Sequence, residues 1–302
     1  MKKLISSFLL SCGLSLFLSA CASHGPYKQT ASLSALPLPT YHVGDTFIYT
    51  NGYSETVKQI NGEKITWQAG SATEVVAYRN FLLPSLHWQT HEKESHGLIH
   101  EQPDMMFPLN HGNDERFTMT RTVIDKLDGQ EKEYVQAWDC TVDGSYEITV
   151  AAGTFDTMKI SCYRFYRTWL RQTRIFYYAP SINHYVLRED QFKSRPSHKI
   201  ELASYIPSLT FLSATDQKSL QESFQLAMEH NLSNVGVNWF GKGKRAQSTI
   251  KPLKSFRTDR ALFCRTFEQS IAYGEFQRNF FGNVCRHTDG IWRYTRVKTH
   301  LG

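Results

Sequence analysis

Apolar and polar residues alternate along much of residues 41–210, which is the pattern of β-strands that bury one face. Clear alternating runs lie at 134–142, 146–150 and 158–162. Turn residues separate such runs, and Asn61-Gly62 between two of them is a strong hairpin signal. Ten or more short strands of this kind predict a β-sandwich or a barrel-like sheet.

Residues 214–230 change this period to three and four residues, which is typical of an amphipathic α-helix. The apolar positions of this stretch are Leu220, Phe224, Leu226, Ala227 and Met228. Thr215 or Asp216 is the expected N-cap, because a short polar side chain accepts a hydrogen bond from the first turn. His230 and Asn231 mark the expected end.

The charge distribution divides the chain near this helix. Residues 22–230 hold 19 Lys and Arg against 24 Asp and Glu, whereas residues 231–302 hold 13 against 4, so the net charges are −5 and +9. We expect a mainly β chain, with a β-sandwich or barrel-like N-terminal domain at 41–210. A small disulfide-stapled β (α+β) domain follows at 214–302.

The first 20 residues have the organisation of an export signal. Lys2 and Lys3 precede an apolar run over residues 4–18, which is too short to span a bilayer comfortably. The run ends in Leu18-Ser19-Ala20-Cys21, which resembles the lipobox of bacterial lipoproteins. The resemblance implies cleavage of a signal peptide over 1–20 and attachment of palmitate-type acyl chains to Cys21, whose thiolate is the attacking nucleophile. An ordinary secretory signal is the alternative.

Residues 21–40 are rich in Ala, Ser, Leu and Pro, and we expect them to form a flexible tether from the lipid. In enterobacterial-type sorting, an Asp after the lipidated Cys retains the protein in the inner membrane. Ala22 therefore favours the outer membrane, with the protein on its periplasmic side or at the cell surface.

Four cysteines remain after such processing, and an exported protein meets an oxidising compartment in which disulfides form. They are Cys140, Cys162, Cys264 and Cys285. Three connectivities are open, and the spacing favours Cys140–Cys162 and Cys264–Cys285, one in each domain. A metal site is the rival interpretation, which lacks support from any CxxC pair or close Cys–His spacing.

Four short sequence motifs of the first domain occur together in one class of proteins. They are Val43-Gly44-Asp45, Met106-Phe107-Pro108-Leu109, Ala152-Gly153-Thr154-Phe155 and Tyr178-Ala179-Pro180. The set resembles periplasmic β-domains of unknown function found in lipoproteins. The resemblance implies a fold and no chemistry.

A second ordered set of motifs lies near the C-terminus. Its members are Trp239, Gly241, Cys264-Arg265, Cys285-Arg286 and Asp289-Gly290-Ile291-Trp292. Over about residues 220–297 the chain resembles the C-terminal domain of the small bacterial outer-membrane surface-antigen lipoproteins. It departs from that family upstream, where the large acidic β-domain replaces the usual Gly-rich membrane-associated segment.

Candidate chemistry is sparse. Histidines gather at His87, His91, His96, His100 and His111. Imidazoles four residues apart share a metal on a helix, but Pro84 argues against a helix here, and on a strand His87 and His91 lie about 13 Å apart. We therefore assign no metal, no cofactor and no catalytic residue.

A Gly-flanked loop carries Lys242, Lys244 and Arg245, which are the candidate anion-binding residues. They suit phosphate groups of lipid A, and the alternative is a solvated loop. Because aromatic residues are thinly interleaved with these basic ones, no nucleic acid partner is expected.

These features predict a non-catalytic, lipid-anchored envelope lipoprotein of the outer membrane with a structural or binding role. Its expected partners are the membrane, through the lipid, and an envelope polymer or protein. One alternative is a module that binds anionic polymer, lipopolysaccharide or glycan, through the basic C-terminal domain. The other is a cell-wall hydrolase, for which the sequence offers no nucleophile–base motif such as GxSxG.

Lipidation is directly testable by metabolic labelling with a fatty-acid analogue. The wild-type chain should be labelled, and Cys21→Ser should not, because serine lacks the thiolate that takes the lipid. Cys12→Ser is the matched control, and it should be labelled like wild type. Equal labelling of the Cys21→Ser variant would exclude lipidation at this position.

Overall fold

The computed structural model describes residues 27–70, 73–259 and 261–295. The expected signal peptide at 1–20 and the lipidation site Cys21 lie outside the described residues. Within the described part of the chain, no helix is both long enough and apolar enough to cross a membrane.

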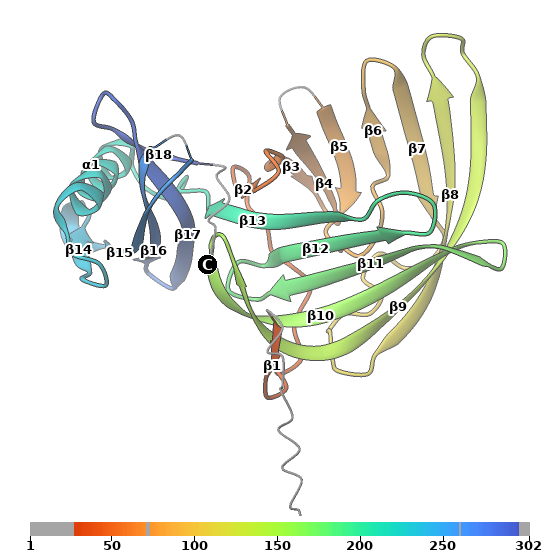
Figure 1. Cartoon of the computed structure of the whole chain (residues 1–302), viewed down its shortest axis with the longest axis horizontal. Coiled ribbons are helices and arrows are strands. Elements are labelled where there is room, and N and C mark those ends of the chain that lie inside the picture. Colours follow the sequence, from red (N-terminus) through yellow and green to blue (C-terminus); the bar gives the residue numbers. More distant parts are fainter. Residues whose placement is uncertain (1–26, 71–72, 260, 296–302) are drawn as a thin grey trace, which may run out of the picture.

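Twelve strands of the described chain form a closed antiparallel barrel. They are β2 (Thr46–Tyr49), β3 (Ser54–Asn61), β4 (Lys64–Ala69), β5 (Thr73–Tyr78), β6 (His87–Gln89), β7 (Lys93–Ile99), β8 (Asp114–Asp125), β9 (Glu131–Val150), β10 (Gly153–Tyr166), β11 (Trp169–Ala179), β12 (His184–Phe192) and β13 (His198–Ile206). Each strand pairs with the next, and β13 closes the barrel by pairing with β2, where Tyr205 lies opposite Phe47. The mainly β prediction is confirmed, in its barrel-like form (Figure 1).

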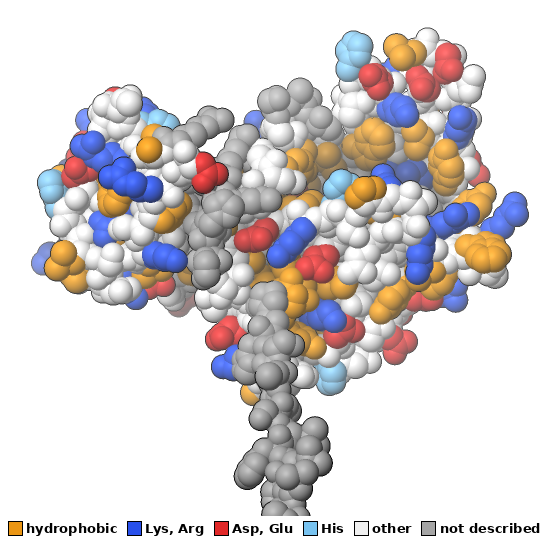
Figure 2. All heavy atoms as spheres, in the orientation of Figure 1, with side chains coloured by type: hydrophobic (Ala, Val, Ile, Leu, Met, Phe, Trp, Pro, Cys, Tyr) orange, Lys and Arg blue, Asp and Glu red, His pale blue; other side chains and the backbone are white. Residues whose placement is uncertain are grey.

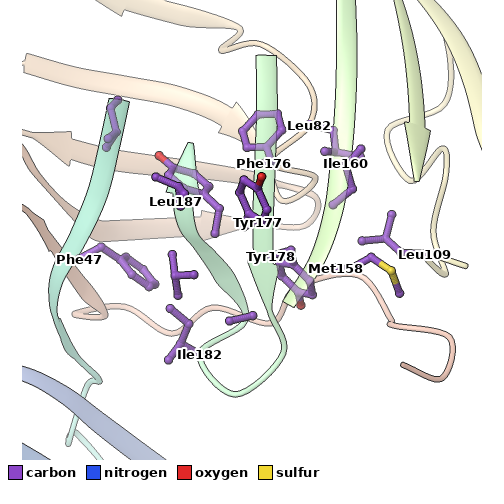
Figure 3. Close-up of a cluster of buried hydrophobic side chains, with 14 of the residues drawn as sticks. Phe47, Leu82, Leu109, Met158, Ile160, Phe176, Tyr177, Tyr178, Ile182 and Leu187 are labelled. Atoms are coloured by element: carbon purple, nitrogen blue, oxygen red, sulfur yellow. The ribbon is translucent and has the colours of Figure 1, made fainter. Parts of the chain in front are cut away.

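The barrel interior is filled by the alternating residues that the sequence pattern picks out. Residues opposite one another on antiparallel strands share a face. Met158 of β10 lies opposite Tyr178 of β11, and Ile160 lies opposite Phe176, and all four are buried. Figure 3 shows these side chains converging with Leu109, which a loop contributes.

Both disulfides join neighbouring strands. Cys140 of β9 is directly opposite Cys162 of β10 and bonded to it. Cys264 is bonded in the same way to Cys285, in the C-terminal part. These are the two pairs that the spacing favours, and each bridge is buried.

A second, smaller sheet follows the barrel and is covered by one helix. Its elements are α1 (Ala214–His230), β14 (Val237–Phe240), the 3₁₀ turn η1 (Lys242–Lys244), β15 (Ala246–Arg257), β16 (Phe263–Tyr273), β17 (Phe276–Arg286) and β18 (Trp292–Tyr294). The helix has the predicted bounds, but its N-cap is Ser213, whose hydroxyl accepts from the backbone N–H of Asp216. Leu226, expected on the apolar face, is exposed, because the buried stripe runs through Leu220, Phe224, Ala227 and Met228.

Two hydrophobic clusters lie on either side of the expected boundary at 210–214. One spans residues 36–205 and the other residues 212–292. The two sheets nevertheless join, because β17 pairs with β13 at Gly282 and Ser204. The Nδ2 of Asn283 donates to Ala151 O at 2.7 Å across the same junction, so the modules are docked through backbone as well as side chains.

The expected tether at 21–40 lies partly against the barrel. β1 (Tyr27–Gln29) pairs with β9, and Leu36 is buried and forms a bridge with Leu109. The reason is the hydrophobic effect: burying the apolar surface of Tyr27 and Leu36 against the barrel outweighs the conformational entropy that the segment would keep as a free coil. From Tyr27 onward this segment is part of the domain.

At the junction between the two sheets, we expect Gly282 to tolerate no larger side chain without a loss of stability. A Cβ at Gly282 would approach the backbone Cα of Ser204 at 2.8 Å, with the Ser204 side chain closer still. Gly282→Ala should therefore lower the free energy of unfolding by about 2 kcal/mol, measured by urea denaturation of the full chain. In a Ser204→Gly background the same substitution should cost less. An unchanged cost there would show that the strand contact is not the cause.

Candidate functional site

The inner face of the barrel changes from apolar to cationic along β10, β11 and β12. The successive cross-strand rows are Met158–Tyr178–Tyr185, Ile160–Phe176–Arg188, Cys162–Arg174–Asp190 and Arg164–Gln172–Phe192. The strand alternation that builds the core thus also aims Arg164, Arg174 and Arg188 inward. The arginines therefore lie toward the end of the barrel that holds the C-terminal ends of β10 and β12.

Three adjoining cavities follow this gradient. An inner chamber of about 290 Å³ is lined by Glu55, His184 and Tyr185 among others. It shares Arg174 and Arg188 with a cavity of about 470 Å³. We call this second cavity the arginine cleft, and its charged lining is Arg164, Arg174, Arg188, Asp190, Arg195 and Lys199.

An outer pocket of about 670 Å³ continues from the arginine cleft, with which it shares Arg164, Phe192 and Arg195. Its other lining residues include Tyr134, Phe165, Tyr166 and Arg171. Figure 2 shows Lys and Arg side chains gathered among hydrophobic ones at the right-hand end of the barrel. The three cavities therefore offer cations at the centre and aromatic surface at the entrance.

The arginines of the cleft are held in place while their outer edges stay free. Asp190 accepts from the Nε of both Arg174 and Arg188, at 3.0 Å for Arg188, and is itself buried. Among the described residues, the terminal Nη atoms of these two guanidinium groups donate no hydrogen bond. The Nε of Arg164 is buried and has no partner within the described chain. A guanidinium that is fixed at Nε and open at Nη is oriented to bind an anion in bidentate fashion.

Burial and mutual repulsion lower the pKa of several of these cations, whereas the nearby Tyr185 phenol and the Asp190 and Glu55 carboxylates raise the pKa of Arg188 in spite of its burial. Burial lowers the pKa of Arg174, and the neighbouring charge of Arg188 lowers it further. Burial, with the charges of Arg164 and Arg174, lowers the pKa of Arg121 on β8 to about 10. Asp190 is the acid hydrogen-bonded to Arg174 and Arg188. The lining of the arginine cleft therefore carries more cationic than anionic charge. An anionic ligand would relieve this repulsion.

In the inner chamber, one carboxylate organises several aromatic and imidazole groups. Glu55 Oε1 accepts from the hydroxyls of Tyr49 and Tyr185 and lies 3.0 Å from His184 Nε2. The other ring nitrogen of His184 lies 2.7 Å from the hydroxyl of Tyr41. Burial opposes ionisation of Glu55, but its hydrogen bonds with His184 and Tyr49 hold its pKa below the ordinary value.

The anion-binding residues expected from the sequence lie on η1 and directly after it, between β14 and β15. Lys242, Lys244 and Arg245 are all exposed, and no hydrogen bond or ion pair of their side chains is seen among the described residues. Their backbone is anchored, because Lys242 N donates to Asp216 at 2.8 Å. Their role in anion binding stays a prediction.

The motifs that carry the surface-antigen resemblance attach α1 to the small sheet. Arg265 donates to the carbonyls of Met228 and Asn231 at the end of the helix, at 3.0 and 2.7 Å. Arg286 and the indole of Trp292 both donate to Glu229. These residues therefore explain the fold of the module and leave its ligand open.

The arginine cleft was missed by the sequence analysis because net charge was counted over too long a segment. Within the acidic residues 22–230, the stretch 164–199 alone holds 8 Lys and Arg against 2 Asp and Glu. A shorter window, combined with the period-two spacing of Arg164 behind Ile160 and Cys162, would have indicated an inward-facing basic group.

Comparisons with known proteins give limited matches. No protein-family model matches the chain. The 17 kDa surface antigens of Rickettsia felis and Rickettsia prowazekii are each 28% identical to it over 78 residues, which is 26% of this chain and 49% of the antigen. The chain thus spans about half the length of the curated relatives it matches. These matches support the resemblance to surface antigens loosely, over one part of the chain.

Two solved structures are similar in outline. The hypothetical lipoprotein YmcC from Escherichia coli has a TM-score of 0.39 at 9% identity, covering 54% of this chain and 84% of that one. A protein with a YmcC-like fold from Bacteroides fragilis has a TM-score of 0.31 at 13% identity, covering 56% of this chain and 98% of that one.

The Glu55 network predicts a pH-dependent stability. Because the pKa of Glu55 is lowered on folding, its stabilising effect is present above the ordinary carboxyl pKa of 4.5 and is lost as the pH falls through the folded value. Glu55→Gln should lower the free energy of unfolding by about 3 kcal/mol at pH 7. The difference from wild type should be smaller at about pH 3 than at pH 7, because the stabilising effect of the carboxylate declines once the pH falls below 4.5.

Urea denaturation at the two pH values measures both effects. Glu74→Gln is the matched control, because Glu74 is an exposed residue of β5, and this substitution should change stability little at either pH. A gap between wild type and Glu55→Gln that is equal at both pH values would contradict the buried ionised carboxylate.

Proposed function

We propose that the chain is a non-catalytic envelope lipoprotein, anchored through Cys21 in the outer membrane, whose barrel binds an anionic ligand. The arginine cleft is the single observation that carries the binding role. The anchor rests on the lipobox-like N-terminus, and the envelope location is supported by the surface-antigen matches.

The lining of the cavities defines the chemistry of the ligand. Guanidinium groups recognise carboxylate and phosphate oxygens, and the free Nη edges of Arg174 and Arg188 provide such contacts. The outer pocket adds the rings of Tyr134, Tyr166 and Phe192, against which a sugar ring can pack its apolar face. We therefore propose an acidic glycan, with its charged group in the cleft and a neighbouring sugar in the outer pocket.

A hydrolase has one geometric argument in its favour, since Glu55, His184 and Tyr41 follow the order of an acid, an imidazole and a hydroxyl. The hydroxyl of Tyr41 is a poor nucleophile, however. Burial, which is the largest effect, and the nearby phenol of Tyr178 raise its pKa well above the ordinary value. Because activation of a nucleophile requires a lowered pKa or a proton-accepting base in reach of substrate, we favour a structural role for these three residues.

The exposed η1 turn is the second candidate for anion binding. Its side chains lie in solvent, whereas Arg174 and Arg188 of the arginine cleft are already oriented by Asp190. Ordering an exposed long side chain on binding costs about 0.5–1.5 kcal/mol, so the cleft is favoured.

Binding of an oligogalacturonate by the full chain, measured by isothermal titration calorimetry, tests the proposal. Wild type should bind it and should not bind a neutral dextran of equal length. Arg164→Gln and Arg195→Ala should each weaken binding about tenfold, since each removes a charge-assisted contact. Raising the salt concentration should also weaken binding, because screening grows.

Arg116→Ala is the matched control, because Arg116 is an exposed residue of β8 paired with Asp139 on the barrel wall. It should bind like wild type. Equal loss in Arg116→Ala would reveal non-specific attraction. Loss only on replacing Lys242, Lys244 and Arg245 together would transfer the role to η1.

A further inference from the structure

A cluster of metal-ligating side chains lies on the outer face of the barrel, on the β6–β7 hairpin. His87 of β6 is directly opposite His96 of β7, and the ring centroids are 4.9 Å apart. Glu94 lies two residues before His96 and so shares its face. Ser95, between them, is buried and receives a hydrogen bond from Arg121, which places the histidines on the other side of the sheet.

The three side chains converge on one point. Glu94 Oε1 lies 3.3 Å from His87 Nε2 and 2.9 Å from His96 Nε2. All three donor atoms lie within 4.8 Å of one another. Ligands of a tetrahedral zinc ion, at metal distances of about 2.0–2.2 Å, stand about 3.3 Å apart. Small side-chain rotations would therefore bring the three atoms into coordination.

We propose that His87, Glu94 and His96 form a binding site for a divalent late transition metal, represented by Zn²⁺. Two imidazoles and one carboxylate are a donor set that suits such ions. His96 is half exposed and the other two are partly exposed, so an ion can enter from solvent and retain water at an open position. The bound ion would link β6 to β7.

The cation of Lys126 lies beside one of the two oxygens of the Glu94 carboxylate. Lys126 Nζ lies 4.0 Å from Glu94 Oε2, on the oxygen that does not face the histidines. It is held there by Gln89 Oε1 and Thr90 O, both at 3.2 Å. Oε1 is thus left for the metal, while the positive charge of Lys126 opposes a divalent ion. Lys126→Met should therefore bind the metal more tightly.

Titration of ZnCl₂ into the full chain, prepared without a histidine tag and stripped with a chelator, tests the site by calorimetry. Wild type should bind one equivalent of Zn²⁺. His96→Ala and Glu94→Gln should each weaken binding at least tenfold, the lower bound for groups that merely support a ligand. Saturating Zn²⁺ should raise the Tm of wild type and not that of His96→Ala.

His91→Ala and His100→Ala are matched controls, because His91 lies in the hairpin turn and His100 lies 3.0 Å from Thr120 beyond the end of β7. Both should bind like wild type. Circular dichroism verifies that each variant is folded. Absence of binding by wild type, or equal affinity in His96→Ala and wild type, would overturn the site. Neither result bears on oligogalacturonate binding by the arginine cleft.

Discussion

The pairing of β13 with β2 is the constraint on which the rest of the structure depends. It closes the sheet, gives every strand from β2 to β13 two neighbours, and creates an interior that must be filled or have its polar groups paired. At one end the interior is filled by side chains such as Phe176 and Met158. At the other it is lined by arginines that Asp190 holds by hydrogen bonds. The core and the candidate site are therefore successive rows of the same inward-facing pattern.

Local chemistry made much of this fold predictable. The run that ends at Cys162 alternates with period two, and residues 214–230 form α1 as predicted. The hairpin that Asn61-Gly62 signals is also present, with Gly62 and Glu63 as the turn between β3 and β4. The two disulfides follow from residues facing inward on adjacent strands. Barrel closure could not be read in the same way, because alternation indicates that a strand buries one face but does not identify its partners.

The candidate sites depend on such pairings, and for this reason the sequence revealed little of them. His87 was compared with His91 along one strand, but a turn at residues 90–92 reverses the chain and brings His96 opposite His87. Nothing near Arg188 in the sequence indicates that it shares an ion-pair partner with Arg174. The two share Asp190 only because β11 and β12 are in register. Likewise, the segment from Tyr27 looked like a tether because its binding surface, β9, lies more than 100 residues later.

The buried arginines of the cleft destabilise the fold, and this loss of stability is the physical basis for proposing a binding role. Removing a cation from water is unfavourable, and a well-packed apolar residue in its place is often as stable or more so. Here burial lowers the pKa of both Arg164 and Arg174, and like charges add to the effect. Asp190 offsets part of it through its hydrogen bonds with Nε of Arg174 and Arg188, both of which line the cavity. A fold selected for stability alone would continue the apolar rows of Met158 and Ile160 to the end of the barrel. Positions at which a sequence breaks its own packing pattern are where functional residues are expected, and the positive charge at these positions is the reason for proposing an anionic ligand.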